Sequence, residues 1–127
     1  MSRIFQTRYF SRWLRKTELK EHDLYKAVQE MEQGLIDADL GGCVVKKRIG
    51  LAGRGKRSGA RTLVATNKDN RWFFLFGFEK NERANISNEE KEALQTLAKD
   101  LLSRTAHELD NAVLTGALQE INYEHKN

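Results

Sequence analysis

The most apolar stretch of the chain is RWFFLFGFEK, residues 71–80. Its aromatic residues favour a β-strand, and they stand at consecutive positions, so both faces of that strand are apolar. Such a strand is typical of the centre of a sheet, covered on at least one side. Two further strands are expected at residues 43–49 and 61–67. Asn67-Lys-Asp-Asn70 has the composition of a hairpin turn. The three strands therefore predict an antiparallel meander.

Helical patterns stand before and after this meander. Apolar spacing predicts helices at residues 7–16 and 20–33. Two capping boxes, Ser87 with Glu90 and Thr105 with Glu108, predict two more. Short strands are expected at residues 2–6 and 118–123, a turn-rich connector at 37–42 and a glycine-rich loop at 50–59. The order β-α-α-β-β-β-α-α, with a possible last strand, predicts an α+β fold: an antiparallel twisted sheet with helices packed on one face.

Length and composition limit the class of protein. The chain has 127 residues, and domains usually run to ~100–150 residues, so we expect one domain over residues 1–127. Its single cysteine, Cys43, excludes an internal disulfide and suits the cytoplasm. No segment approaches the roughly 18 apolar residues of a membrane span, so no membrane partner is expected.

The charge is unevenly distributed along the chain. Residues 1–41 carry seven basic and seven acidic side chains, and residues 85–127 carry four basic and eight acidic. Residues 42–84 carry eleven basic and three acidic, a net charge of +8. A basic segment of this kind indicates a polyanionic partner, with nucleic acid the first candidate. The alternative is a solvated basic surface without a ligand.

Two basic clusters suit phosphate binding. The loop GLAGRGKRSGAR, residues 50–61, combines glycines with cations, although it is not a Walker A loop. The segment FEKNERANI, residues 78–86, places charges at the end of the central strand. The alternatives are a flexible hairpin connection and a salt-bridged strand exit. His22, His107 and His125 are too dispersed for a metal site, so an enzyme built from this sequence would use Lys and Arg. These suit RNA cleavage, in which a 2′-hydroxyl attacks the adjacent phosphate.

Four motifs carry a family resemblance. They are Lys46-Lys-Arg48, Gly53-Arg-Gly-Lys-Arg57, Gly59-Ala-Arg-Thr-Leu63 and Gly77 to Ile86. With the element order, they make the chain similar to the RelE/ParE toxin superfamily, in its HigB/RelE-like branch. The resemblance implies a toxin of a type II toxin–antitoxin system. It also implies an mRNA interferase that cleaves mRNA on the translating ribosome, inhibits translation and uses no metal or cofactor. The implied partners are mRNA, the ribosome and an antitoxin of the helix-turn-helix kind.

The resemblance also implies site residues. Arg61, Lys80 and Arg83 match the family's basic positions, and Lys47 and Lys56 correspond to its lysines more loosely. The expected catalytic residues are thus Lys47, Lys56, Arg61, Lys80 and Arg83. The expected RNA-binding residues are Lys46, Arg48, Arg54, Arg57 and Arg71. The chain departs from the RelE pattern with Asn81 after the exit lysine and Ser87 in place of a base-stacking tyrosine. Two alternatives stay open: a ParE-like inhibitor of gyrase without enzymatic activity, and a basic nucleic-acid-binding module.

Overall fold

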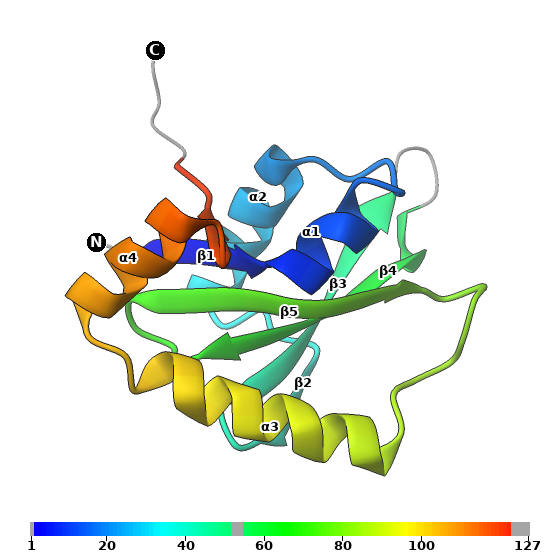
Figure 1. The fold of residues 1–127 in the computed structure, drawn as a ribbon. Helices are drawn as coiled ribbons and strands as arrows, with labels where there is room; N and C mark the ends of the chain where they lie inside the picture. Colours follow the sequence, from blue (N-terminus) through cyan, green and yellow to red (C-terminus); the bar gives the residue numbers. More distant parts are fainter. Residues whose placement is uncertain (1, 52–54, 123–127) are drawn as a thin grey trace.

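A computed structural model of the chain describes residues 2–51 and 55–122, and only the backbone of residues 55–58. Two helices come before a run of four strands and two come after it (Figure 1), and this grouping confirms the α+β class. The elements in chain order are β1 Arg3–Thr7, α1 Arg8–Leu14, α2 Glu21–Glu32, β2 Ala38–Gly41, β3 Val44–Leu51, β4 Gly55–Thr66, β5 Arg71–Glu79, α3 Asn88–Leu102, α4 Ala106–Thr115 and β6 Leu118–Glu120.

The strands form one sheet in the order β2-β3-β4-β5-β1-β6. The predicted antiparallel meander is present as β3, β4 and β5. The expected antiparallel sheet is in fact mixed, because β1 pairs parallel with β5, with Phe5 opposite Phe73. β5 is an interior strand, as predicted, and Trp72, Phe73 and Phe74 are fully buried. β1 ends beside the middle of β5, so α1 begins alongside the second half of that strand.

Two predicted loops contain strand. Within the expected connector 37–42, β2 pairs with β3, with Ala38 opposite Lys46. The expected loop 50–59 is shorter than predicted, because β4 begins at Gly55, opposite Leu51. The two backbones approach closely at Gly59, where a Cβ atom would lie 2.3 Å from the carbonyl oxygen of Ile49. Glycine is therefore required there by close strand packing and not by a flexible turn.

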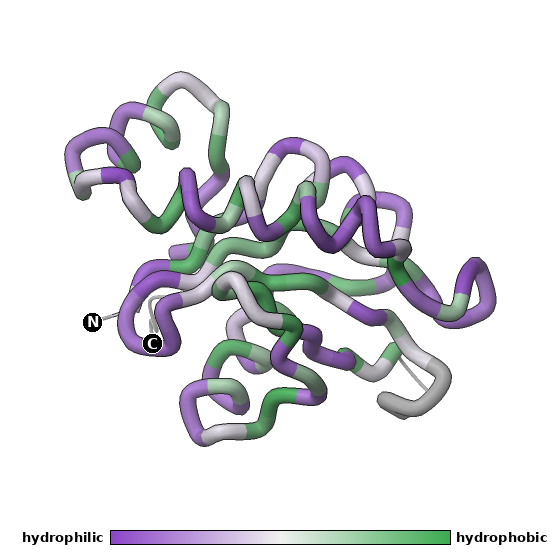
Figure 2. The backbone as a smooth tube through the Cα atoms, turned by 90° about the horizontal axis from the view of Figure 1, so that it is seen from below, coloured by the Kyte–Doolittle hydropathy of each residue, from purple (hydrophilic) through white to green (hydrophobic). Residues whose placement is uncertain are grey.

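Helices cover both faces of the sheet, so the prediction that they pack on one face is wrong. α1 and α2 cover one face, where Phe10, Leu24 and Phe74 belong to one buried cluster. α3 and α4 cover the other, where Phe73 and Leu101 belong to a second cluster. Each amphipathic helix needs an apolar surface for its stripe, and the strands supply one on each side. Figure 2 shows hydrophobic strands running through the middle, between helices with many hydrophilic residues.

The predicted helix signals are confirmed at α3 and α4. Ser87 and Glu90 form a capping box at the start of α3, and Thr105 and Glu108 form another at the start of α4. α4 ends at Gly116, which has a φ of 85°. The segment between β5 and α3, residues 80–87, reaches from the end of the central strand to the start of α3 (Figure 1). Among the described residues, no helix is long and apolar enough to cross a membrane.

Candidate active site

Cations and aromatic rings meet on the face of the sheet that α3 covers, near the end of β5. Side chains directly opposite each other on paired strands share a face. Arg61 of β4 stands opposite Arg48 of β3 on one side and opposite Phe78 of β5 on the other. In the next row, Lys46 is opposite Leu63, which is opposite Phe76. We name Lys46, Arg48, Arg61 and Arg83, with Phe76 and Phe78, the cationic face.

Arg61 is the buried cation of this face. It is 9% exposed, and its Nη1 lies 3.5 Å from the carbonyl oxygen of Gly59. The neighbouring Phe78 is 2% exposed. An arginine side chain stays protonated in proteins, so Arg61 supplies a positive charge there. A cation screened from water attracts an anion more strongly than an exposed one does. Arg61 is therefore suited to holding a phosphate group in a fixed position.

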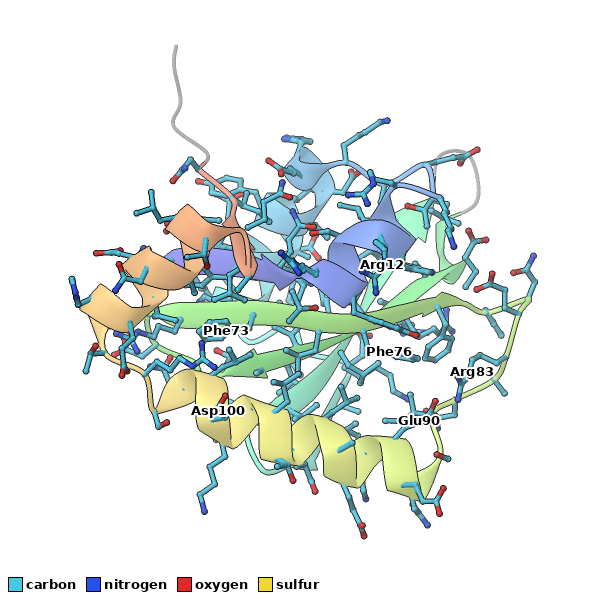
Figure 3. The ribbon with its side chains drawn as sticks, viewed as in Figure 1. Arg12, Phe73, Phe76, Arg83, Glu90 and Asp100 are labelled. Atoms are coloured by element: carbon cyan, nitrogen blue, oxygen red, sulfur yellow. The ribbon has the colours of Figure 1, made fainter. Side chains whose placement is uncertain are left out.

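Arg83 lies over the two aromatic rings. Its guanidinium carbon is 5.6 Å from the centroid of Phe76 and 5.5 Å from that of Phe78, within the range of cation–π attraction. Nε donates to the carbonyl oxygen of Asn85 at 3.1 Å, and Nη1 donates to Oε2 of Glu90 at 3.1 Å. Nη2 donates to the other oxygen of Glu90. Figure 3 shows Arg83 and Glu90 directed toward each other. Arg83 is thus held from three sides.

Glu90 serves two groups at once. It pairs with Arg83, and it accepts a hydrogen bond of 2.7 Å from the backbone nitrogen of Ser87. The hydrogen bond from Arg83, followed by that from Ser87, holds the pKa of Glu90 below its usual value. The alternative interpretation of this segment, a salt-bridged strand exit, is therefore correct in part. The partner of Arg83 comes from α3, however, and not from Glu79 or Glu82.

Two further cations of the face have side-chain partners in segments outside the strands, Asn85 before α3 and Asp37 before β2. Nζ of Lys46 donates to Oδ1 of Asn85 at 3.1 Å. Arg48 pairs with Asp37, 3.0 Å from Nε to Oδ1, and its backbone nitrogen donates to Oδ2. Burial raises the pKa of Asp37, but the hydrogen bonds and charge of Arg48 together outweigh this effect. The pKa of Asp37 therefore lies below its usual value. Acids from outside the basic segment thus neutralise part of its charge.

Tyr9 lies at the candidate site, although it is not among the site residues expected from the sequence. It stacks on Phe76 with 5.6 Å between ring centroids and 10° between ring planes, yet it is 54% exposed. Tyr9, Phe76 and Arg83 therefore form a continuous stack at the cationic face. The tyrosine comes from α1, which lies beside β5 only because β1 pairs parallel with that strand. The only signal in the sequence is an aromatic residue within Arg8-Tyr-Phe10.

Two predicted residues are not brought to this face. Strand alternation turns Lys47 to the opposite side, where it is 3% exposed. There its Nζ pairs with Glu30 at 2.8 Å and donates to the carbonyl oxygen of Leu35 at 2.9 Å. Arg71 begins β5, seven residues before Phe78, which corresponds to about 23 Å along a strand. Its Nη1 donates to the carbonyl oxygen of Arg104.

The remaining predicted residues lie near the end of β5 or outside the described part. Lys80 follows β5 directly and is exposed, and its backbone nitrogen donates to the carbonyl oxygen of Gly59 at 3.3 Å. Lys56 and Arg57 lie in β4, but their side chains are outside the described residues, as is all of Arg54. Within residues 2–51 and 55–122, no group of three His, Cys, Asp or Glu side chains is placed to hold a metal ion.

Comparisons with known proteins give one match. The family model described as "RelE toxin of RelE / RelB toxin-antitoxin system" matches residues 2–121. A search of curated proteins finds no match. The family match spans nearly the whole chain, including β1, the cationic face and β6.

Proposed function

Because the chain belongs to the RelE toxin family, we propose that it is an endoribonuclease that cleaves mRNA on the translating ribosome. It is the toxin of a toxin–antitoxin system, and a cognate antitoxin is its partner. Beyond the family match, we propose that the toxin acts in the cytoplasm, where translation takes place. We also propose that the antitoxin is a helix-turn-helix protein.

The observation that carries the proposal is the row of Arg61, Phe78 and Arg83. A buried arginine stands beside an aromatic ring, and a second arginine covers that ring. Proteins that hold single-stranded RNA combine cations for the phosphates with aromatic or guanidinium planes for the bases. The cationic face has both within one strand pair and the turn that follows it.

The proposed reaction needs no covalent enzyme intermediate. The 2′-oxygen of a nucleotide attacks the adjacent phosphorus, and the bond from phosphorus to the next 5′-oxygen breaks. The products are a 2′,3′-cyclic phosphate and a 5′-hydroxyl. A base takes the proton of the 2′-hydroxyl, and an acid gives a proton to the 5′-oxygen. Negative charge gathers on the phosphate oxygens in the transition state, where Arg61 supplies fixed positive charge.

We assign the remaining roles to side chains near Arg61. Lys80 is exposed at the same end of the sheet and is our candidate for proton transfer. Lys56 stays a candidate for the same step. Arg83 positions the substrate, because Glu90 already holds both of its terminal nitrogens. Lys46 and Arg48 bind the RNA backbone at the edge. Lys47 has no part in this scheme, because it lies beneath α2.

Mapping of mRNA ends tests the proposal. Purified toxin is added to ribosomes translating a defined mRNA, and the new 5′ ends are sequenced. We expect cuts in phase with the codons, with 5′-hydroxyl ends, and we expect Arg61→Gln to abolish them. Arg71→Gln is the matched control, since Arg71 lies at the far end of β5. Uncut mRNA with the wild-type toxin would contradict the proposal, as would equal loss in both variants.

One observation favours a second function. Arg48 and Arg83 are both paired with carboxylates, as in a binding surface whose charges are set for a protein partner. The second candidate is therefore a ParE-like toxin that inhibits gyrase by binding it. A supercoiling assay separates the two: inhibition of purified gyrase with intact mRNA supports this candidate, and the reverse result supports the ribonuclease.

A further inference from the structure

A second basic surface lies on α1, outside the cationic face. Arg8, Arg12 and Arg15 follow one another at a spacing of four and three residues, which places them along one side of a helix. All three are exposed. With Ser11, Gly116 and Gln119 they line a groove of about 340 Å³. The surrounding residues 1–41 are neutral in sum, because seven basic side chains are balanced by seven acidic ones.

The arginines of this groove differ from those of the cationic face in their partners. No ion pair is found for Arg8, Arg12 or Arg15 among the described residues. No carboxylate lines the groove. Glu21 lines the adjoining pocket, but it accepts hydrogen bonds from Gln6 and Gln119. The groove therefore presents three arginines that form no ion pair within the described part of the protein.

The groove also has a fixed shape. Nε of Arg8 donates to the carbonyl oxygen of Gly116 at 3.0 Å, which ties the start of α1 to the segment after α4. The hydroxyl of Ser11 donates to Oε1 of Gln6 at 2.9 Å, and both side chains are buried. An arginine that is already oriented loses less side-chain entropy when it binds an anion.

The groove is connected to the cationic face through Tyr9. Arg8 and Tyr9 are neighbours in the chain, and Arg12 lies one helical turn after Arg8. Tyr9 stacks on Phe76, which Arg83 covers. Figure 3 shows Arg12 on α1 and Phe76 on β5 at the same end of the sheet. A strand leaving the cationic face over Tyr9 therefore reaches the arginines of α1.

We propose that the α1 groove binds phosphate groups of the RNA strand whose cleavage site occupies the cationic face. The inference rests on the proposed function for the identity of the strand. Three arginines without an ion pair in the described part of the protein suit a run of phosphates, and arginine matches phosphate geometry with two donors at once.

The test measures RNA affinity as a function of salt. Arg12→Gln/Arg15→Gln removes two exposed charges and spares Arg8 with its bond to Gly116. Lys26→Gln/Lys99→Gln is the matched control, since it removes two exposed charges from α2 and α3. Fluorescence anisotropy is recorded with a single-stranded RNA of about 16 nucleotides, the upper site size for one binding domain. A trinucleotide that occupies the cationic face alone is titrated in parallel.

We expect a specific change with the longer RNA. The plot of log affinity against log salt concentration becomes shallower by up to about 1.4, because each phosphate contact on a single strand contributes about 0.7. The control double variant and the trinucleotide show no such change. Equal slopes for the two double variants would overturn the inference. So would a loss of affinity for the antitoxin with RNA binding unchanged, which would make the groove a protein-binding surface.

The cleavage assay and the salt-dependence measurement distinguish a failure of the α1 groove from a failure of the proposed function. If the wild-type toxin cuts mRNA and the slope is unaffected by the α1 substitutions, the groove has no role in RNA binding and the ribonuclease proposal stands. If the slope changes as expected but mRNA stays uncut, the groove binds RNA and the proposed reaction is wrong.

Discussion

Arg83 and Glu90 lie seven residues apart in the chain and form an ion pair in which both terminal nitrogens of the arginine reach both oxygens of the carboxylate. Through it, the start of α3 holds the segment that leaves β5. The same carboxylate caps α3 at Ser87. One side chain thus fixes both the helix and the cation that covers Phe76 and Phe78.

This pair predicts a pH dependence of stability. The pKa of Glu90 lies below its usual value because Arg83 and Ser87 donate to the ionised form. The stabilisation is therefore complete above the unfolded-state pKa of about 4.3, and it is lost as the pH falls through the lower folded-state pKa. We expect the free energy of unfolding of the wild type to exceed that of Glu90→Gln near neutral pH, and the difference to shrink below about pH 4. Urea unfolding of both proteins across this range measures it, and a constant difference would contradict the assignment.

We expect the ion pair of Lys47 and Glu30 to stabilise the fold and to have no role in cleavage. Lys47→Met removes a buried cation that pairs with Glu30 and donates to the carbonyl oxygen of Leu35, so we expect a marked loss of stability. Breaking a fully buried pair costs roughly 3–5 kcal/mol, and the cost here is smaller because Glu30 keeps 22% exposure. The double variant Lys47→Met/Glu30→Leu recovers much of that loss, since it removes the carboxylate together with the lysine that pairs with it.

Cleavage assays separate this role from a catalytic one. At a temperature where Lys47→Met is folded, its cleavage rate should stay close to that of the wild type. A rate that falls in both the single and the double variant, with both folded, would restore Lys47 to the active site.

The sequence was sufficient for most of the helices and strands, although it missed β2, and it was insufficient for the faces on which their side chains lie. Consecutive aromatics in residues 71–80 predicted an interior strand, and Asn67 to Asn70 predicted its hairpin, because both signals are local. In any strand over residues 43–49, Lys46 and Lys47 face opposite sides, because side chains alternate along a strand. It did not show which side carries the site, because that depends on how helices cover the two faces. The position of Tyr9 depends on the parallel pairing of β1 with β5, a contact between segments about seventy residues apart.

The charge of the chain could likewise be read from the sequence only in part. The excess in residues 42–84 was visible in the sequence, and four of its described cations lie together at one end of the sheet. Their partners, Asp37 and Glu90, come from the neutral first third and the acidic last third. A count along the chain adds charges that the fold has already paired. It also hides arginines such as Arg12, whose segment is neutral in sum although its cations gather on one side of α1.

At position 61, we expect arginine and lysine to support different rates of cleavage. Arg61→Lys keeps the charge but loses the planar pair of donors that fits a phosphate, so we expect cleavage to fall strongly. The loss of one transition-state donor typically lowers the rate about 100- to 1,000-fold. The measurement is single-turnover cleavage on programmed ribosomes, with Arg71→Lys as the control. A wild-type rate for Arg61→Lys would show that charge alone suffices.

Tyr9 predicts a contribution from base stacking. Its ring packs on Phe76 through one side and is 54% exposed, so we expect a base of the bound RNA to stack on it. Stacking of a base on an aromatic side chain contributes about 1–3 kcal/mol, so Tyr9→Ala should weaken RNA binding by that amount while Tyr9→Phe should not. Leu114→Ala is a control at another exposed apolar residue, 84% exposed on α4. An RNA series with one abasic nucleotide completes the test, because at the stacked position the wild type and Tyr9→Ala should bind equally well. A difference that persists at every abasic position would mean that Tyr9 acts by supporting Phe76 and Arg83 and not by contact with a base.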